Sequence, residues 1–590
     1  MPTSGLPGLP FLAAVLLSCG LTYLLVRWGI RPRLVAQPRA DRWHGKPTPN
    51  TGGLAILIAS VCCYCSFASS QYLTIAVCAA LISLLGFLDD RVQLRPLVKL
   101  AGQSVAVVVV IASGVVFHVT PWEWANLAIT FLWIVGITNA FNLIDNMDGL
   151  CAGVAVITCV SRLVFAVQDG DPGAELLLAI LAGAVLGFLV FNYNPARIFL
   201  GDCGSMFIGF SLGALAVASP VPNTRVFAST LFCPALTFLY PIFDTALVSV
   251  LRRAAGGPIS VGGRDHSSHR LVSLGLSERK AVWLLWLLSA AGSVVGLLTY
   301  SLPFGVLVIA ILLILGVTMF GGFLGTLPAY APPQSSPVRS AWIRRHIPNL
   351  RSGVTLLVDT LLAGVALLTA FLIRWEGTFV GPPLHRFLFY LPIIMGFQML
   401  ACFVFRTFDS GWRWFGIRDL FALGSCTLVG SVASAFTLWF LSMRSYSRAV
   451  ILLYAFFVFV FTTGLRLLMC VLWQTLAEPV STRRAVVLGA NGATELIVLV
   501  LQRSRAIDAK PVAVFDPDPA ANRLRIHGVA VHYAGENALH LLRQIRADLV
   551  VVPCGEELND GHRRILEQCR EAGVPIEQFE TGMTSYRAMA

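Results

Sequence analysis

The fold class is decided by residues 124–167, which read WANLAITFLWIVGITNAFNLIDNMDGLCAGVAVITCVSRLVFAV. Two apolar runs, each of about the 20 residues that a helix needs to cross a bilayer, flank the polar segment NLIDNMDG at 142–149. Charge beside a bilayer is costly and usually marks a function. The stretch therefore predicts a membrane protein with a polar site where two spans meet.

The apolar pattern recurs along the chain. Of the 590 residues, 56% are hydrophobic and 13% are charged, whereas soluble domains carry about 25% charged residues. We expect about 15 spans, eleven before a Pro/Ser-rich stretch and four after it. They are predicted near 11–30, 52–69, 71–88, 100–118, 122–141, 150–168, 174–192, 204–219, 226–250, 281–300, 302–323, 353–373, 385–405, 420–441 and 449–473.

The basic residues predict the orientation of these spans. If the N-terminus lies outside, the inner loops before the C-terminal tail hold roughly 22 Lys and Arg residues and the outer loops roughly 5, which is the positive-inside bias. The net charge of +12 is scattered over short loops and forms no stripe, so nucleic acid is not an expected partner.

After Leu476 the sequence changes character. RRAVVLGANGATELIVLVLQRS reads as a strand, a glycine turn and a helix, and KPVAVFDPDP and ADLVVVPCG read as short buried strands. Strands that alternate with helices predict a parallel α/β domain. The expected fold is a polytopic α-helical membrane protein with a C-terminal Rossmann-like α/β domain. Its expected parts are 1–323 (first membrane domain), 324–352 (linker), 353–475 (four-helix membrane domain) and 476–590 (α/β domain).

Under this topology, carboxylates at the ends of several spans fall on the inner face. The set comprises Asp89, Asp90, Asp145, Asp148, Asp202, Asp244 and Asp265, with His266, His269 and Arg270 nearby in sequence. Acids with a few bases suit a diphosphate substrate held through Mg²⁺, because that ion is typically bound by one or two carboxylates plus substrate phosphates. Basic side chains would bind the remaining phosphate oxygens.

Each fragment also has a purely structural interpretation. Adjacent acids at a helix end are often favourable or simply solvated there. Asp145 and Asp148 stand three residues apart and could share one exposed helix face. His266 and His269 have the same spacing, and such histidines are more often polar loop residues than metal ligands. Only the combination of several fragments on one face favours a site.

The motifs that carry these residues resemble a known family. HGKPTPNTGG, GFLDDR followed by a lysine, NAFNLIDNMDGL, NPARIFLGDCGS, PIFDT and GGRDHSSHRLVSLGLS occur in this order. They resemble the polyprenyl-phosphate N-acetylhexosamine-1-phosphate transferases, relatives of the phospho-MurNAc-pentapeptide translocase. The resemblance implies transfer of a sugar 1-phosphate, most simply GlcNAc-1-phosphate, from a UDP-sugar to undecaprenyl phosphate, with release of UMP.

The resemblance also implies roles for individual residues. Asp89, Asp90, Asp202, His266 and His269 would be catalytic, with Asp202 and Asp89 as ligands of Mg²⁺ (or Mn²⁺), and Lys46, Asn142, Asp145, Asp148, Asn194, Arg264 and Arg270 would bind substrate. The sequence DHSSHR is closer to the branch that uses UDP-GlcNAc than to the translocase branch, which has a run of adjacent histidines. Implied partners are the bilayer of a bacterial inner membrane, downstream glycan-assembly enzymes and further copies of the chain.

The C-terminal part resembles the N-terminal region of membrane-bound nucleotide-sugar 4,6-dehydratases and epimerases. Gly489, Gly492 and Asp516 would then contact a nucleotide or nucleotide-sugar, although the G-x-x-G spacing is shorter than the full dinucleotide motif. The chain ends where the catalytic domain of that family would begin, and its tail has no Tyr-x-x-x-Lys pair. We therefore expect a sensing or docking module, with a non-functional remnant as the alternative.

Three functions of different classes remain. A transferase requires acids on one face. A transporter would place charges at mid-membrane positions and use broken helices. A membrane-anchored nucleotide-sugar oxidoreductase would need a domain that this sequence lacks. The sequence favours the transferase, with UDP-GalNAc or a deoxy-amino-sugar donor as alternatives to UDP-GlcNAc.

Overall fold

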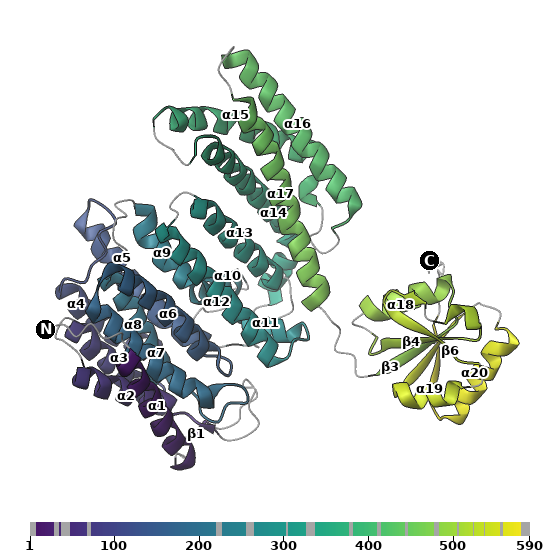
Figure 1. Cartoon of the computed structure of the whole chain (residues 1–590), viewed down its shortest axis with the longest axis horizontal. Helices are drawn as coiled ribbons and strands as arrows, with labels where there is room; N and C mark the ends of the chain where they lie inside the picture. The colour runs from purple at the N-terminus through teal and green to yellow at the C-terminus, as the bar shows by residue number, and fades with distance from the viewer. Residues whose placement is uncertain are drawn as a thin grey trace. The chain divides into compact units, whose positions relative to one another are not determined.

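The computed structural model contains two compact units, Met1–Val471 and Leu472–Ala590 (Figure 1). It describes residues 8–28, 35–36, 48–67, 72–219, 227–254, 263, 265–301, 305–325, 337–376, 381–409, 415–442, 447–476, 483–503, 507–522, 524–535, 537–554 and 558–579. The predicted division of the first unit into two membrane domains and a linker stays a prediction.

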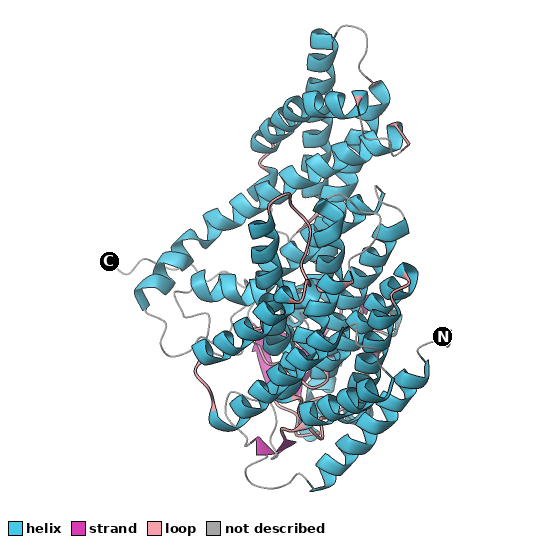
Figure 2. Ribbon diagram, turned by 90° about the vertical axis from the view of Figure 1, so that its left-hand side faces the viewer, coloured by secondary structure: helices cyan, strands magenta, loops and turns pink. Residues whose placement is uncertain are grey.

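The first unit is almost entirely helical (Figure 2). Its first part contains α1 (Gly8–Trp28), α2 (Gly52–Phe67), α3 (Leu73–Val92), α4 (Pro96–Ala112), α5 (Glu123–Ile144), α6 (Leu150–Asp169), α7 (Pro172–Asn192), α8 (Gly201–Ala218), α9 (Phe227–Thr237), α10 (Leu239–Ala254), α11 (Ser267–Ser273), α12 (Glu278–Ser301) and α13 (Gly305–Gly325). A short antiparallel pair, β1 (Val35–Ala36) and β2 (Thr48–Pro49), precedes α2. Four long helices follow, α14 (Pro337–Arg374), α15 (Pro382–Val404), α16 (Ile417–Ser442) and α17 (Arg448–Leu476).

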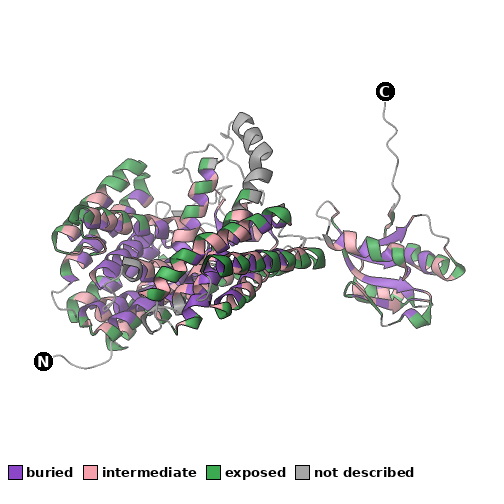
Figure 3. Cartoon of the chain, turned by 90° about the horizontal axis from the view of Figure 1, so that it is seen from above, coloured by how far each residue is buried: buried purple, intermediate pink, exposed green. Residues whose placement is uncertain are grey.

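The expectation of a polytopic membrane protein is confirmed. Within the described residues, 12 helices are long and apolar enough to span a bilayer, or 13 if one bent pair counts as a span. The two predicted spans at α2 and α4 form helices of only 16 and 17 residues. Large apolar side chains are also exposed, as expected in lipid, with Leu132 69% and Leu287 66% exposed. Figure 3 shows exposed residues along the outer faces of the helices.

One sequence expectation needs correction. The predicted single span at 226–250 is a broken pair, Leu231–Thr237 and Leu239–Arg253, bent by 83°. Pro241 has no amide hydrogen to donate to the carbonyl of residue 237, so one continuous helix cannot pass this point without losing that bond. Helix α14 begins at Pro337, inside the predicted linker 324–352, and the role of that segment as a linker stays a prediction. Proline is tolerated in the first turn of a helix.

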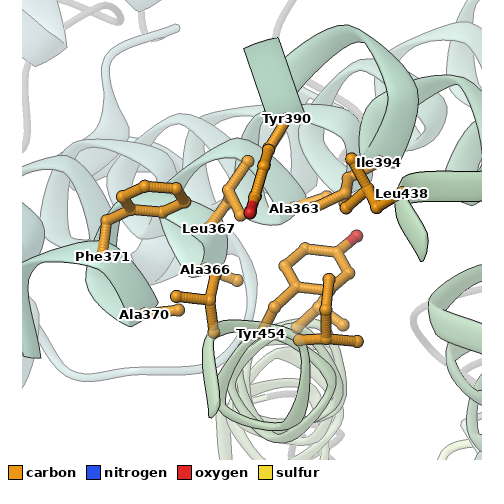
Figure 4. Close-up of a cluster of buried hydrophobic side chains, with 12 residues drawn as sticks. Ala363, Ala366, Leu367, Ala370, Phe371, Tyr390, Ile394, Leu438 and Tyr454 are labelled. Carbon is orange, nitrogen blue, oxygen red and sulfur yellow. The ribbon is translucent and has the colours of Figure 1, made fainter. Parts of the chain in front are cut away.

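The four long helices enclose an apolar core of their own. Ala363, Ala366 and Ala370 lie on one stripe of α14, and their small side chains leave room for Tyr390 of α15 and Tyr454 of α17 (Figure 4). Small residues at the contacts between membrane helices allow such close packing.

The second unit is the predicted α/β domain. Its six strands are β3 (Arg484–Leu488), β4 (Lys510–Asp516), β5 (Arg525–Ile526), β6 (Val529–Tyr533), β7 (Leu549–Pro553) and β8 (Ile576–Phe579), in the order β5-β6-β4-β3-β7-β8. All neighbouring pairs are parallel except β5 with β6. Alternate residues of each strand point to opposite faces. One face packs on α18 (Gly492–Arg503), and the other packs on α19 (Ala538–Ile545) and α20 (Asp560–Glu571).

Candidate active site

Two carboxylates from different helices meet at one lysine in the first unit. Asp89 lies near the end of α3, Lys99 in the first turn of α4 and Asp202 in the first turn of α8. The Lys99 Nζ atom is 2.7 Å from Asp89 Oδ2 and 2.9 Å from Asp202 Oδ2. The side chains of Lys99 and Asp202 are 24% and 29% exposed, so the cluster is accessible from one side.

Glycines allow the helices to come this close. A Cβ atom on Gly86 of α3 would lie 2.4 Å from the Asp202 carbonyl oxygen, and one on Gly53 of α2 would lie 2.2 Å from the Gly204 nitrogen. Real side chains do not fit at these distances. The glycines that end the motif HGKPTPNTGG therefore serve close packing against α8, in which 89% of the span is buried.

Asp90 binds the start of α8. Its carboxylate accepts hydrogen bonds from the backbone N–H groups of Asp202 and Cys203, both at 3.1 Å, and from Asn50 Nδ2 at 3.0 Å. The first N–H groups of a helix lack partners within that helix. Asp90 thus satisfies the start of α8 from a neighbouring helix and fixes the position of Asp202.

The Asp89 and Asp202 pair has the chemistry of a hard-cation site. Carboxylate oxygens are ligands that Mg²⁺ prefers, and this ion usually keeps positions for water and substrate phosphates. No group of three or more His, Cys, Asp or Glu side chains placed to hold a metal occurs among the residues that the structure describes. Two carboxylates converging on one positive charge fit a cation that completes its coordination with substrate.

The polar segment 142–148 connects three parts of the site. Asn142 Nδ2 donates to Ser205 Oγ of α8 at 3.0 Å. Asn146 Oδ1 accepts from Ser268 Oγ of α11 at 2.6 Å. Asp148 Oδ2 accepts from the Ala196 N–H at 2.9 Å. The segment between two spans therefore ties together α8, the histidine-containing helix and the loop before α8.

The loop before α8 extends this network. Asn194 Nδ2 donates to Glu278 Oε2 of α12 at 2.7 Å and lies 3.4 Å from Asp148 Oδ2. Arg279 Nε donates to the Asn194 carbonyl oxygen at 3.1 Å. Asp145 follows α5 directly at its C-cap. The structure thus brings Asp148 and Asn194 together with Glu278, and the role of these residues in binding substrate stays a prediction.

The two histidines lie on a buried polar support. His266 Nδ1 is 2.7 Å from Asp244 Oδ2, and Asp244 Oδ1 accepts from the Ser267 N–H at 2.8 Å and from Ser267 Oγ at 2.5 Å. Asp244 is fully buried in α10, just after the 83° bend. His269 lies next to His266, with ring centroids 6.2 Å apart. The bent helix therefore delivers the carboxylate that orients His266.

Basic residues hold the rest of this loop. Arg252 Nε and Nη2 donate to the two Asp265 carboxylate oxygens at 2.6 and 2.7 Å. Arg270 donates to the carbonyl oxygens of Asp265 and Leu324 at 2.8 and 2.9 Å, so its guanidinium anchors the loop to α13. Burial pushes the pKa of Asp265 up, but the hydrogen bonds and charge of Arg252 outweigh it and hold that pKa below its ordinary value.

Two residues of the predicted substrate-binding set, Lys46 and Arg264, lie outside the described residues. The sequence assigned no role to Lys99, although it follows GFLDDR, and none to Asn50, Ser205, Ser268 or Glu278. A charged residue in the first turn of an apolar helix was the signal that could have identified Lys99. Gly489, Gly492 and Asp516 belong to the second unit, where the Asp516 carboxylate accepts from the N–H groups of Ala490 and Asp518 at 2.6 and 2.7 Å.

Comparison with known proteins decides the family. A family model described as glycosyl transferase family 4 matches residues 72–220, which contain both carboxylates, the lysine and segment 142–148. The chain is 35% identical over 290 residues to the probable undecaprenyl-phosphate N-acetylglucosaminyl 1-phosphate transferase of Bacillus subtilis, a match that covers 47% of this chain and 80% of that protein. The chain belongs to glycosyl transferase family 4.

Other family members match the same region. A decaprenyl-phosphate N-acetylglucosaminephosphotransferase of Mycolicibacterium smegmatis is 34% identical over 310 residues, covering 45% of this chain and 76% of that protein. A phospho-N-acetylmuramoyl-pentapeptide-transferase of Desulforamulus reducens is 31% identical over 324 residues, covering 49% and 93%. A second family model, described as a CoA-binding domain, matches residues 416–578. The resemblance of the first part to these transferases is confirmed.

Proposed function

We propose that this family 4 transferase moves N-acetylglucosamine 1-phosphate from UDP-GlcNAc to undecaprenyl phosphate. An oxygen of the lipid phosphate bonds to the β-phosphorus of the donor, the bond from that phosphorus to the UMP oxygen breaks, and UMP leaves. The observation that carries the proposal is the pair of carboxylates held on Lys99 beside the polar segment 142–148, within the region that matches GlcNAc-1-phosphate transferases.

The side chains support this chemistry directly. Phosphoryl transfer depends on positioning and charge neutralisation more than on covalent help. A phosphate monoester has a second pKa near 6, so the acceptor is already largely ionised at neutral pH. Asp89 and Asp202 would hold Mg²⁺, which supplies charge neutralisation when bound. Lys99 adds a positive charge between them, and Asp90 keeps Asp202 in place.

The remaining residues fit the donor. Asn142, Asp145, Asp148 and Asn194 supply amide and carboxylate groups of the kind that orient a nucleotide by hydrogen bonds. The histidine loop, with His266 held by Asp244, adds ring nitrogens that can donate to phosphate oxygens. Lys46, Arg264 and Arg270 complete the proposed substrate-binding set, with Arg270 acting through the loop that it anchors.

Topology supports a location as well. The excess of Lys and Arg in alternate loops supports an N-terminus outside the plasma membrane of a bacterium. The proposed active site would then face the cytoplasm, where UDP-sugars are made. Residues 1–323 would form the transferase domain, 353–475 a separate four-helix domain and 476–590 a cytoplasmic domain.

The experiment is a donor panel with purified full-length protein. Undecaprenyl phosphate, Mg²⁺ and one of UDP-GlcNAc, UDP-GalNAc or UDP-linked deoxy-amino sugars are supplied, and UMP is measured. Release from UDP-GlcNAc that requires both lipid and Mg²⁺ supports the proposal. Release only from another donor would correct the sugar, and no release from any donor by folded protein would reject the reaction.

The α/β unit favours a second, separate binding function. Strand β3 ends at Leu488, Gly489 follows with φ +85°, and the 12-residue helix α18 begins at Gly492. In doubly wound sheets, nucleotide ligands bind at the edge where the parallel strands end. A CoA-binding family model covers it. We infer a nucleotide-containing ligand, with Asp516 shaping the loop. Equilibrium dialysis with labelled CoA, UDP-GlcNAc and ATP tests this inference, and binding of none would reject it.

A further inference from the structure

A pair of amide side chains joins α4 to α5 one helical turn beyond the charged cluster. Asn139 Nδ2 of α5 donates to Gln103 Oε1 of α4 at 2.7 Å, and Gln103 Nε2 lies 3.5 Å from Asn139 Oδ1. Gln103 is only 2% exposed. Buried polar side chains are costly within membrane helices and usually mark a function, and the proposed reaction so far gives this pair no task.

The amide pair lies on the face of α4 that carries the lysine. Gln103 follows Lys99 by four residues, so the two side chains are neighbours on one face of the helix. Among the described residues, no other hydrogen bond joins α4 to α5. On the side of α3 the contact is apolar where Gly102 packs on Leu85. Because apolar contacts have no preferred direction, the amide pair is the contact that fixes the rotation of α4 against α5.

The pair also leads back to the charged cluster through α5 and α8. Asn139 precedes Asn142 by three residues on one face of α5. Asn142 Nδ2 donates to Ser205 Oγ at 3.0 Å, and Ser205 Oγ donates to the Gly201 carbonyl oxygen at 3.0 Å. Gly201 directly precedes Asp202. Hydrogen bonds and single helical turns thus form a closed circuit over α4, α5 and α8 that begins and ends at the charged cluster.

We propose that Gln103 and Asn139 are positioning residues that hold Lys99 between its two carboxylates. This inference rests on the proposed function. Because Gln103 is almost fully buried, the pair acts through the helix that carries Lys99 rather than by touching a substrate. Phosphoryl transfer depends on where the neutralising charges stand, and a displacement of about 1 Å can cost about 100-fold in rate.

Apolar replacements test the pair. Gln103→Met and Asn139→Leu each remove one amide and leave a side chain of similar size. The double variant leaves neither amide without its partner, and replacing both partners by apolar groups can be nearly neutral for stability, so it serves if a single variant fails to fold. Thr138→Val is the matched control, because Thr138 is fully buried in α5 and its hydroxyl donates to the Ile134 carbonyl oxygen of the same helix.

The rate of UMP release should change without the affinities for substrate. We expect kcat to fall about tenfold in the single and double variants of the pair, whereas KM for UDP-GlcNAc and for undecaprenyl phosphate stays within about twofold. Thr138→Val should change neither quantity. A raised KM at constant kcat would make the amides substrate ligands and overturn the proposal. Wild-type kcat in the double variant, or an equal loss of kcat in Thr138→Val, would overturn it as well.

Lysine labelling of the full-length protein gives a second readout that does not depend on turnover. The chain has four lysines, and an acylating reagent reacts with a lysine only as the neutral amine. The two carboxylates favour the charged form of Lys99, so a displaced Lys99 should be acylated about threefold faster or more, relative to the exposed Lys280. Unchanged relative labelling of Lys99 in folded variants would overturn the proposal. If the wild-type protein turns over no donor, the proposed function fails, and the labelling alone decides the role of the pair.

Discussion

At the residue scale, two adjacent carboxylates have different tasks. Asp89 shares Lys99 with Asp202, whereas Asp90 binds the backbone at the start of α8. The sequence DD gives no hint of this division, because successive residues of a helix point in directions about 100° apart. Which of the two carboxylates reaches Lys99 depends on the helices that pack against each side of α3.

Asp202→Asn should nearly abolish transfer. The change removes one negative charge from the proposed cation site and weakens the bond to Lys99, and loss of one preorganised charge-stabilising group typically costs about 100-fold or more in rate. The rate of UMP release measures the effect. An Asp202→Asn protein with normal melting temperature and more than a tenth of the wild-type rate would contradict the assignment.

Asp90→Asn should act chiefly on stability. An amide oxygen can replace only part of the carboxylate's acceptor capacity, so a backbone N–H of α8 loses its partner, at a cost of about 1–3 kcal/mol in the free energy of unfolding. A lowered melting temperature with a smaller loss of rate than in Asp202→Asn is expected. The opposite ranking of the two variants would make Asp90 the catalytic residue.

At the element scale, the segment after α5 organises the site. Asn142, Asn146 and Asp148 bind three different elements. The sequence showed that this segment is polar and lies between spans, and it placed most of the helices, because apolar length is a local signal. It could not show the bend at α9 and α10 or the partners of each side chain, because these depend on contacts between residues far apart in the chain.

The bond between Asn146 and Ser268 should couple the two elements. A double-mutant cycle of Asn146→Ala and Ser268→Ala is expected to give about 1 kcal/mol of interaction in kcat/KM, because one hydrogen bond is lost in either single variant. Ser104, which bonds only within α4 in the contacts described here, provides a control whose Ala variant should combine additively with Asn146→Ala. Additivity in both cycles would show that the bond is irrelevant to the reaction.

The histidine loop should loosen in acid. The pKa of Asp265 is held below its ordinary value by Arg252, so this pair stabilises the fold above the ordinary pKa of aspartate, about 3.9, and the stabilisation is lost as the pH falls through the lower folded-state pKa. Melting temperatures between pH 6 and pH 3 measure this effect. Asp265→Asn should flatten the acid-side decline, and an unchanged profile would contradict the role of the pair.

At the scale of the whole molecule, the proposed transferase site lies within the first unit. Every described residue assigned to it precedes residue 325, and the unit boundary falls at Val471. The CoA-binding family model begins at residue 416 and continues into the α/β unit, which favours an evolutionary link between the last membrane helices and that unit.

A chain ending at residue 471 should therefore keep transferase activity. The α/β unit has its own two-sided core, and every described residue of the proposed site belongs to the first unit. We expect the rate of UMP release per folded molecule to stay within about threefold of that of the full chain, a change of less than 1 kcal/mol. Complete loss of activity in a folded truncated protein would assign the second unit an essential part in the reaction.

The most direct measurement uses UDP-GlcNAc labelled with ³²P at the β-phosphate. The account predicts that the label moves into lipid-extractable product together with the sugar, that unlabelled UMP is released, and that Asp202→Asn abolishes both while Asp516→Asn, in the second unit, changes neither. Label that stays in water as UDP while the sugar enters the lipid would show transfer of sugar without its phosphate and would contradict the central claim.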